Sequence, residues 1–265
     1  MGISKLIALK ATLLLSVFVY LKNLGFTLIS IPFIYASLVS YLVSIASHPG
    51  INLPLLLGKK SDGSLPLWSI LIFGPFLYFV RLFGLTRRLV SKEPPYNEVC
   101  EGVYVGGWPY SLKTLPPGEP AIIDCTAELP RTLAVSHCSY FCIPTWDTRA
   151  PQPSEIESAV KWALRKRALN KPVFIHCAFG HGRSVAVTCA LLVALGVAED
   201  WKSAENIIRE QRPCINMNSL HRKSLEEWSM HRMSSKSKNE EGSLNVSGVL
   251  LSDSSQQKRV RAAKY

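Results

Sequence analysis

The chain has 265 residues, which is enough for one domain of ordinary size with additional segments. Its formal net charge of +11 favours contact with anionic phosphates or with the cytosolic face of a membrane. Seven cysteines, an odd number without a closely spaced framework, argue against a disulfide scaffold and against a CxxC zinc site. No basic stretch is interleaved with aromatic residues, so we expect no nucleic-acid partner.

Residues 1–86 are strongly apolar, and we predict a membrane region there with two or three helical spans. Residues 24–46 are almost free of charge and long enough to cross the roughly 30 Å hydrocarbon core of a bilayer. Residues 65–85 form a second such run, and the shorter run 6–21 is either a third span or an interfacial helix. A helical hairpin buried in a soluble protein is the alternative interpretation.

The distribution of basic residues favours an even number of spans, with both ends of the chain in the cytosol. With two spans, Lys59 and Lys60 lie on one side of the membrane, and most other basic residues of the region lie on the opposite side. With three spans this bias nearly vanishes. We therefore expect an integral, multi-pass membrane protein whose soluble part faces the cytosol and whose partners include membrane lipids.

The rest of the chain divides by composition into three segments. Residues 87–98 are basic and then proline-rich, and they are expected to be a linker. Residues 99–232 have an ordinary soluble composition and are expected to form a folded soluble domain. Residues 233–265 are rich in Ser, Lys and Asn, which is typical of a disordered basic tail.

Within residues 99–232, short apolar strands alternate with helical patterns. Strands are expected over residues 102–106, 121–125, 139–143 and 173–177. Helices are expected over residues 154–169, 184–195, 200–211 and 219–231. Ser154 and Glu157 have the spacing of a capping box at the start of the first helix. This alternation predicts an α/β domain with a central, largely parallel sheet flanked by helices, and ligands then bind beyond the carboxyl ends of the strands.

Residues 173–184 read Val-Phe-Ile-His-Cys-Ala-Phe-Gly-His-Gly-Arg-Ser, which predicts a strand, a tight loop and the start of a helix. Such a turn directs backbone N–H groups and the positive end of the helix dipole at one point, which suits a phosphate or sulfate. The planar guanidinium of Arg183 adds paired N–H groups that can donate hydrogen bonds to two oxygens of the same anion. The positive charge of the helix dipole and of Arg183 lowers the pKa of a nearby thiol from about 8.5 towards roughly 3.5–7.5. Cys177 is therefore expected to be a nucleophilic thiolate. A buried structural cysteine is the alternative, but it needs neither the glycines nor the arginine.

The pattern His-Cys-x5-Arg-Ser resembles the signature loop of the cysteine-dependent protein tyrosine phosphatases. Residues 98–230 resemble the small dual-specificity branch of that superfamily, and most closely its membrane-anchored members. The resemblance implies the phosphatase fold, and none of the steps considered below requires a metal or another cofactor. The loop residues expected to bind the substrate phosphate are Ala178, Phe179, Gly180, His181 and Gly182.

Two neighbours of the loop have expected roles in catalysis. The resemblance implies that the hydroxyl of Ser184 donates a hydrogen bond to the Cys177 sulfur and eases its departure. His176 is expected to orient the loop and to help keep the thiolate, although a core histidine with satisfied hydrogen bonds is an overlapping interpretation. A direct role of the His181 side chain in substrate binding is a weaker hypothesis.

A proton donor must also protonate the leaving oxygen. This acid should come from a separate loop, because a carboxylate within the phosphate loop would repel the substrate. Asp147 follows a predicted strand and lies thirty residues before Cys177. The phosphatases that this chain resembles carry their acid on such a loop at about that distance. Asp124 is the rival, but it lies inside an apolar strand and is expected to be structural.

These expectations predict an enzyme that hydrolyses phosphomonoesters through a phosphocysteine. Phosphotyrosine, phosphoserine and phosphothreonine in proteins are the first expectation for the substrate. Phosphatidylglycerophosphate or a phosphoinositide is the second, and a phosphate-binding membrane scaffold without turnover is the third. The loop 178–182 contains no Lys or Arg, which weakens the phosphoinositide hypothesis. Membrane attachment favours a lipid, because lipid head groups are then at high local concentration.

Overall fold

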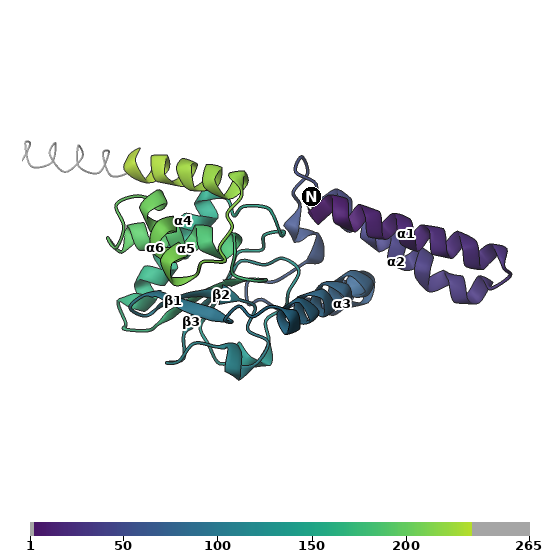
Figure 1. The fold of residues 1–265 in the computed structure, drawn as a ribbon, viewed down its shortest axis with the longest axis horizontal. Coiled ribbons are helices and arrows are strands. Elements are labelled where there is room, and N and C mark those ends of the chain that lie inside the picture. Colours follow the sequence, from purple (N-terminus) through teal and green to yellow (C-terminus); the bar gives the residue numbers. More distant parts are fainter. Residues whose placement is uncertain (1–2, 235–265) are drawn as a thin grey trace, which may run out of the picture.

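The structure is a computed structural model and describes residues 3–234 (Figure 1). Its N-terminal part contains α1 (Ile3–Asn23), α2 (Thr27–Ala46), the short helix η1 (Pro54–Leu57) and α3 (Leu67–Val90). An α/β domain follows, with β1 (Tyr96–Cys100), β2 (Val103–Gly107), β3 (Ala121–Asp124), β4 (Tyr140–Cys142), α4 (Pro153–Arg167), β5 (Val173–Cys177), α5 (Arg183–Ala194), α6 (Trp201–Gln211) and a last helix over residues 219–234. Most of the segment expected to be a disordered tail, residues 235–265, lies outside the described residues.

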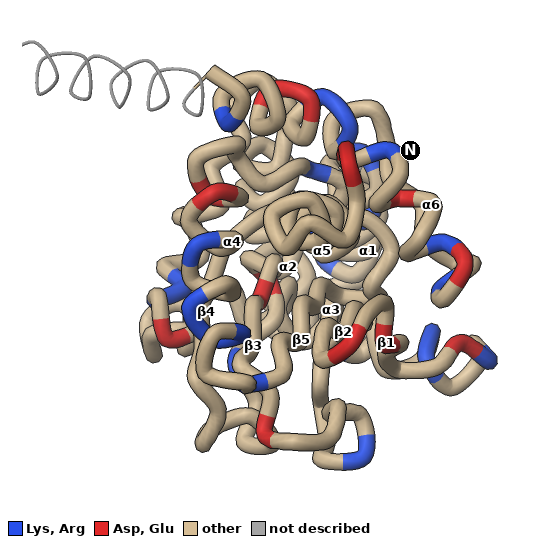
Figure 2. Tube along the Cα trace, turned by 90° about the vertical axis from the view of Figure 1, so that its left-hand side faces the viewer, with Lys and Arg blue, Asp and Glu red and all other residues tan. Residues whose placement is uncertain are grey.

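The sheet has the strand order β1-β2-β5-β3-β4, which can be followed from right to left in Figure 2. Only β1 runs antiparallel to its neighbour, and the pairs β2–β5, β5–β3 and β3–β4 are parallel. The prediction of an α/β domain with a largely parallel sheet is therefore confirmed. The sequence analysis did not predict β1, which begins within the expected linker, and α3 extends into that linker from the other side.

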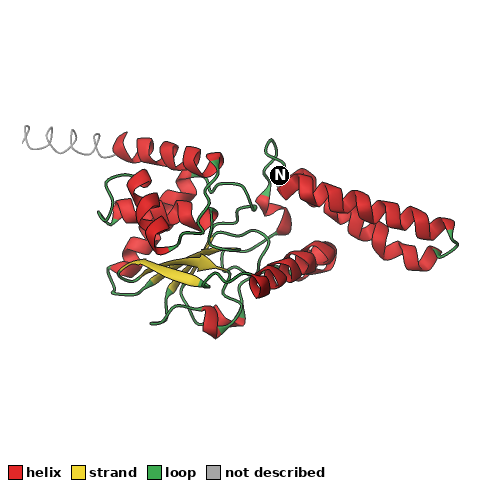
Figure 3. Ribbon diagram, viewed as in Figure 1, coloured by secondary structure: helices red, strands yellow, loops and turns green. Residues whose placement is uncertain are grey.

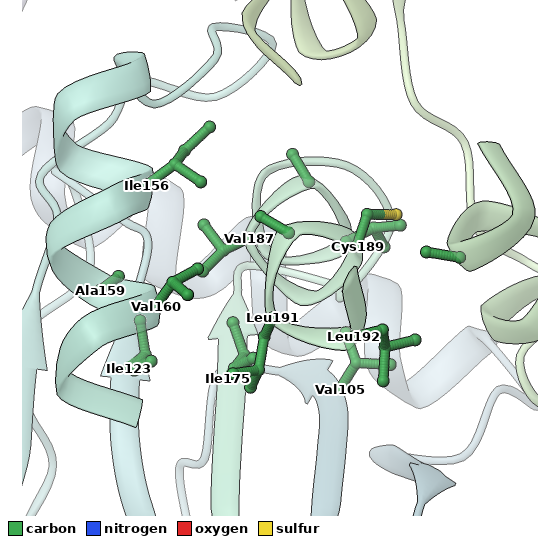
Figure 4. Packing of buried hydrophobic residues seen from close by; sticks show 14 of the residues in the cluster. Val105, Ile123, Ile156, Ala159, Val160, Ile175, Val187, Cys189, Leu191 and Leu192 are labelled. Atoms are coloured by element: carbon green, nitrogen blue, oxygen red, sulfur yellow. The ribbon is translucent and has the colours of Figure 1, made fainter. Parts of the chain in front are cut away.

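The two faces of the sheet are covered differently (Figure 3). Successive side chains of a strand point to opposite faces, so Ile123 and Ile175 pack towards α4 and α5, as Figure 4 shows. Their neighbours Ile122 and Phe174 pack on the other face with Val135 and Cys138. The first ten residues of α5 are all buried, which explains why that helix is apolar all round.

The start of α4 differs from the sequence-based prediction. Gln152 is the N-cap residue and Pro153 occupies the first helical position, where its missing N–H group costs nothing. Glu155, not Glu157, accepts a hydrogen bond from the Gln152 backbone at 2.8 Å. The expected capping box of Ser154 and Glu157 is therefore wrong. The carboxylate of Glu157 instead accepts a hydrogen bond from Trp228 of the last helix at 2.8 Å.

Helices α1 and α2 form an antiparallel hairpin that extends away from the α/β domain (Figure 1). Ser37 and Ser44 of α2 donate hydrogen bonds to backbone oxygens of α1 at 2.8 and 2.7 Å. Small polar residues at such a contact bring two apolar helices close together. Three helices, α1, α2 and α3, are long and apolar enough to cross a membrane.

The helix α3 is placed differently from the hairpin, because its centre and its C-terminal end contact the α/β domain. At its centre Phe76 packs edge-to-face on Trp146, with ring centroids 6.1 Å apart. Near its end, Arg88 donates a hydrogen bond to the carbonyl of Ala178 at 3.0 Å. Four residues before the helix begins, the preceding loop is also held, because the carbonyl of Gly63 accepts a hydrogen bond from the Arg131 backbone at 2.9 Å.

This arrangement conflicts with a topology in which residues 24–46 and 65–85 are the two spans. That topology separates Lys59 from the soluble domain by a membrane. In the structure Lys59 forms a fully buried ion pair with Asp124 at the end of β3. The loop between α2 and α3 and the α/β domain therefore share one side of any membrane, which leaves the α1–α2 hairpin as the part that extends away from the domain.

The hairpin is expected to hold the protein in membranes, because its surface carries large exposed apolar side chains such as Leu13, Leu28 and Leu38. After extraction of membranes with alkaline carbonate, the full chain should remain in the pellet. Extraction with concentrated salt should also leave it there, which excludes attachment by charge alone. Release of the chain into the supernatant by carbonate would contradict integral attachment.

Candidate active site

The loop 178–182 joins the carboxyl end of β5 to the first turn of α5. Gly180 has a φ of 77°, in the left-handed region that favours glycine. A Cβ atom at this position would lie 2.5 Å from the backbone of Gly106, so the close approach of β2 also requires glycine. The tight loop that the sequence predicted is therefore fixed by local backbone geometry.

The carbonyl oxygens of residues 178–181 are all held from behind the loop. Their donors are the backbone N–H groups of Trp108 and Asn216 and the guanidinium groups of Arg88 and Arg212, at 2.7–3.2 Å. In a trans peptide the N–H points away from the C=O. Because the carbonyls face outwards, the N–H groups of the same peptide units face the opposite side, where they can bind an oxyanion.

Cys177 is buried at the base of this loop. Its sulfur accepts hydrogen bonds from the N–H of Gly180 at 3.2 Å and from the hydroxyl of Ser184 at 3.3 Å. Burial raises the pKa of the Cys177 thiol, but the charge of Arg183 and the hydrogen bonds of Ser184 outweigh this effect, and the pKa lies below its ordinary value. The side chain can therefore exist as a thiolate where it would meet a phosphate.

Arg183 is almost completely buried and holds two carboxylates. It forms a bidentate pair with Glu128, with N···O distances of 2.9 and 3.1 Å, and Nη2 also donates to Asp147 at 3.1 Å. Its Nη1 donates to the carbonyl of Thr145 at 2.7 Å. Among the described residues, the buried Nε of Arg183 has no hydrogen-bond partner. A donor is thus left over for a ligand in the loop.

Asp147 lies on a loop whose backbone is held from several sides. Its carboxylate is about half exposed, at 43%, and so reaches both Arg183 and solvent. The next residue, Thr148, has a φ of 64°, which is uncommon for a residue other than glycine and is found at strained functional loops. Asn218 and His221 of the C-terminal part hold the carbonyls of Thr148 and Arg149, both at 2.9 Å.

The N-terminal helices also contact the loop that carries Asp147. The side chain of Arg149 donates two hydrogen bonds to the carbonyl of Ser47, just beyond the end of α2, at 2.9 and 3.1 Å. Trp146 is fully buried in a cluster with Phe76 of α3 and Val43 of α2. Asp147 is therefore flanked by two residues that the membrane region fixes in place.

His176 and Asp124 face each other in neighbouring strands and lie under the loop. Burial lowers the pKa of His176 to about 4, so its ring is neutral at pH 7. A neutral ring supplies no charge to the thiolate, and the expected help in keeping that anion is not supported by this geometry. Asp124 binds Lys59 and the hydroxyl of Tyr140, the latter at 2.7 Å, as a structural carboxylate would.

The side chain of His181 is directed to the linker and not to the interior of the loop. Its Nε2 lies 2.7 Å from a carboxylate oxygen of Glu93. Together with the sulfur of Cys214, these two side chains offer three atoms that could bind a metal ion, all within 4.8 Å of one another. The geometry supports a role of His181 through its backbone and gives no support to direct binding of substrate by its side chain.

The structure therefore brings together Cys177, Arg183, Asp147 and Ser184. The sequence analysis missed Glu128, which orients Arg183, and Arg88, which holds the loop. Glu128 follows the end of a buried parallel strand, and the rule that ligands bind at such ends would have drawn attention to it. Nothing local predicts the role of Arg88, since its partner lies 90 residues away in the chain.

The chain is similar to known proteins over its C-terminal half. Residues 119–231 match the family model described as the dual specificity phosphatase catalytic domain. No curated protein sequence matches the chain. Similar solved structures include PTPMT1 in complex with PI(5)P, with 20% identity, a TM-score of 0.49, and coverage of 54% of this chain and 99% of that chain. Human DUSP28 has 15% identity, a TM-score of 0.46, and coverage of 53% and 96%, respectively.

Proposed function

We propose that the domain over residues 119–231, which matches the dual specificity phosphatase catalytic domain, hydrolyses phosphomonoesters through a phosphocysteine at Cys177. The observation that carries the proposal is the environment of this sulfur. It is buried in a loop of inward-facing N–H groups, beside Arg183, with its pKa below the ordinary value. A scaffold that only binds phosphate has no use for such a nucleophile or for the adjacent Asp147.

In the first step, the thiolate of Cys177 attacks phosphorus and forms the S–P bond while the bond from phosphorus to the leaving oxygen breaks. Asp147 transfers its proton to that oxygen, so the product leaves as a neutral alcohol or phenol. The pair of Arg183 with Asp147 supports this assignment, because it holds the carboxyl group beside the phosphate site.

In the second step, Asp147 is a carboxylate and accepts a proton from a water molecule that attacks phosphorus. The S–P bond breaks and inorganic phosphate leaves. The returning charge on the Cys177 sulfur is stabilised by Ser184, whose hydroxyl lies 3.3 Å away. The enzyme is thereby restored with a thiolate and a protonated Asp147.

Both transition states place charge on the three equatorial oxygens of the phosphoryl group. The N–H groups of residues 178–182 and the free Nε of Arg183 are proposed to bind these oxygens. The bidentate pair with Glu128 holds the guanidinium in one orientation before substrate arrives. Donors that are fixed in advance need no reorganisation during the reaction, and this is their main contribution to the rate.

The membrane arrangement is part of the proposal. We infer that the α1–α2 hairpin enters the bilayer, that α3 lies along the membrane surface, and that the phosphatase domain faces the cytosol. A reactive thiolate requires a reducing compartment. The contacts of the centre and of the C-terminal end of α3 with the domain support a surface position for this helix. The substrate is then a phosphorylated protein or lipid that reaches the active site at the membrane.

Asp147→Asn is the variant that tests the assignment of the acid. With an alkyl phosphate, whose leaving oxygen needs a proton, we expect turnover to fall by roughly 10²–10⁴-fold. With an activated aryl phosphate, whose leaving group is stable as an anion, the first step should be much less affected. Steady-state rates with both substrates measure this difference. Equal losses with both leaving groups, or near-normal turnover at every pH, would remove Asp147 from the role.

A further inference from the structure

An apolar groove with a cavity volume of about 220 Å³ lies between the N-terminal half of α1 and the C-terminal half of α3. This volume is below the usual range of ligand pockets, roughly 300–1,000 Å³, so the groove can take up part of an apolar chain. Its apolar wall is formed by six side chains of the two helices: Leu6, Ile7, Phe76, Phe79, Val80 and Phe83. Several of them remain partly exposed, with Leu6 at 48% and Phe83 at 46%, so the groove is open to an apolar ligand.

One end of the groove is the proposed catalytic site itself. Asp147 and the loop residues Ala178 and Phe179 line the same cavity as the apolar wall. The groove is therefore continuous with the place where the phosphate of the substrate would bind. A ligand that fills it would have its reactive end beside Asp147 and its apolar end between α1 and α3.

The polar end of the groove carries two arginines, which the loop lacks, and two carboxylates, Glu128 and Asp147, which are paired with Arg183. Arg87 and Arg88 line the groove beside Phe179, and the guanidinium of Arg87 lies 4.4 Å from the centre of the Phe179 ring. The loop 178–182 itself has no Lys or Arg. The whole groove thus pairs a cationic, phosphate-binding end with an apolar end, which is complementary to a molecule with a phosphomonoester at one end and hydrocarbon at the other.

The position of the groove also fits a ligand that comes from the bilayer. The α1–α2 hairpin and α3 lie on the same side of the phosphatase domain (Figure 1). All three helices have the length and composition of membrane segments. A cavity walled by two of these helices opens where acyl chains are present, whereas a phosphorylated protein segment would meet an apolar wall with few partners for its backbone.

We propose that the groove between α1 and α3 binds the acyl chains of a glycerophospholipid whose head group ends in a phosphomonoester, and that this lipid is the substrate of the Cys177 site. The proposal rests on the proposed phosphatase activity and names its substrate class. The acyl chains lie against Phe79, Val80 and Phe83. The phosphate enters the loop, and Arg87 and Arg88 flank the glycerol.

The test uses the full chain reconstituted in phosphatidylcholine vesicles and three substrates with the same phosphomonoester. Dioleoyl phosphatidic acid carries two long acyl chains, dioctanoyl phosphatidic acid carries two short ones, and glycerol 3-phosphate carries none. Phosphate release gives kcat/KM for each. We expect kcat/KM to rise along this series by at least about tenfold from the head group to the long-chain lipid, since burial of about two methylene groups corresponds to a tenfold change.

Gly84→Phe is the variant that tests the groove directly. Gly84 lines the groove, and a Cβ atom at this position meets no heavy atom within 4 Å, so the backbone can accept a side chain. Phe also has a better helix propensity than Gly. The added ring occupies space that the acyl chains need. We expect the ratio of kcat/KM for the dioleoyl lipid to that for glycerol 3-phosphate to fall by about tenfold.

Leu82→Phe is the matched control, because it also adds bulk to α3, two residues away. Leu82 is 64% exposed and does not line the groove. This control should keep the wild-type ratio of kcat/KM between the dioleoyl lipid and glycerol 3-phosphate. A fall of that ratio in both variants would mean that any bulk on α3 disturbs the protein, and it would overturn the assignment of the groove.

Three other results would overturn the proposal, and they can be told apart. If wild type hydrolyses an activated aryl phosphate but gains nothing from acyl chains, or prefers a phosphotyrosine peptide to the dioleoyl lipid, the lipid assignment fails and the phosphatase remains. If wild type hydrolyses no phosphomonoester, the proposed function fails as well. An unchanged ratio in Gly84→Phe, with dioleoyl lipid still preferred, would place the acyl chains elsewhere.

Discussion

Cys177→Ser is expected to lower turnover of every phosphomonoester by roughly 10⁵–10⁶-fold. Losses of this size are typical when the nucleophile is removed from a set of catalytic residues that act together. A serine hydroxyl in the same position is not ionised near neutral pH. The loop N–H groups and Arg183 stay in place, so the variant should still bind substrate or the phosphate analogue vanadate. Steady-state turnover, together with vanadate binding by calorimetry, measures the two effects separately.

The same prediction has a chemical form that needs no variant. Near pH 6, iodoacetate should alkylate Cys177 and leave the other six cysteines unmodified. The reason is that only Cys177 has a pKa below the ordinary thiol value, whereas burial raises the pKa of each of the others, to about 12 for Cys142. Mass spectrometry of peptides identifies the modified residue. Alkylation spread over several cysteines at this pH would show that the Cys177 thiol is ordinary.

Cys214→Ser provides the control for this experiment. Cys214 lies near the loop, but burial raises its pKa and it contacts Glu93 and not the phosphate site. This variant should keep the wild-type rate and the pattern of alkylation. A loss of activity comparable to that of Cys177→Ser would mean that the assay reports the integrity of the loop and not the nucleophile.

The signature loop could be predicted from the sequence because all its determinants are local. The strand, the glycines, Cys177 and Arg183 lie within twelve consecutive residues, and their geometry follows from a strand that turns directly into a helix. Asp147 lies thirty residues away, and reaction chemistry, its place after a strand and the resemblance to the phosphatases made it a candidate. The structure brings these candidates together.

The residues that were missed act across long separations in the chain. Glu128 pairs with Arg183 over 55 residues, and Arg88 binds the loop over 90 residues. Arg88 and Lys59 were interpreted only as flanking charges of membrane spans, a rule that concerns exposed residues. A pattern of charge along the chain does not show which lysine is buried, because burial depends on tertiary packing. This is also why the choice of residues 24–46 and 65–85 as the two spans conflicts with the buried position of Lys59.

The linker was difficult to predict for a related reason. Residues 87–98 contain basic residues and prolines, which are typical of a connector. The structure instead has the end of α3 and the start of β1 there, since Tyr96 packs on Tyr104 and Phe174 with ring centroids 5.9 and 6.1 Å away. Arg88 in this segment connects the membrane region directly to the catalytic loop. The segment therefore couples two parts that composition alone separates.

Lys59→Met is expected to lower the free energy of unfolding at pH 7 by about 3–5 kcal/mol, the usual cost when one partner of a buried ion pair is removed. Both Lys59 and Asp124 have fully buried side chains, and Lys59 also donates to the carbonyl of Thr126 at 2.7 Å. The variant leaves the Asp124 carboxylate in the interior without its counter-charge. A typical domain has only about 5–15 kcal/mol of stability, so this loss is large.

The effect should depend on pH in a defined direction. Although burial raises the pKa of Asp124, the charge of Lys59 outweighs this and holds the pKa at about 2, below the ordinary value of 3.8. A carboxyl group whose pKa is lowered by folding stabilises the native state above its unfolded pKa, and this contribution is lost as the pH falls towards the folded pKa. The difference in stability between wild type and Lys59→Met should therefore be full above about pH 4 and shrink between pH 4 and pH 2.

Two further variants make the prediction specific to the pair. Lys60→Met changes the exposed neighbour and should alter stability by no more than about 0.5 kcal/mol. Adding Asp124→Asn to Lys59→Met removes the stranded charge, and the double variant should recover part of the loss, with a coupling energy of about 0.5–3 kcal/mol. Urea unfolding of the full chain in detergent gives these values. A loss of unfolding free energy below about 1 kcal/mol in Lys59→Met would contradict the prediction, and so would additive effects in the double variant. Either result would mean that Lys59 does not stabilise the contact between the α2–α3 loop and the sheet.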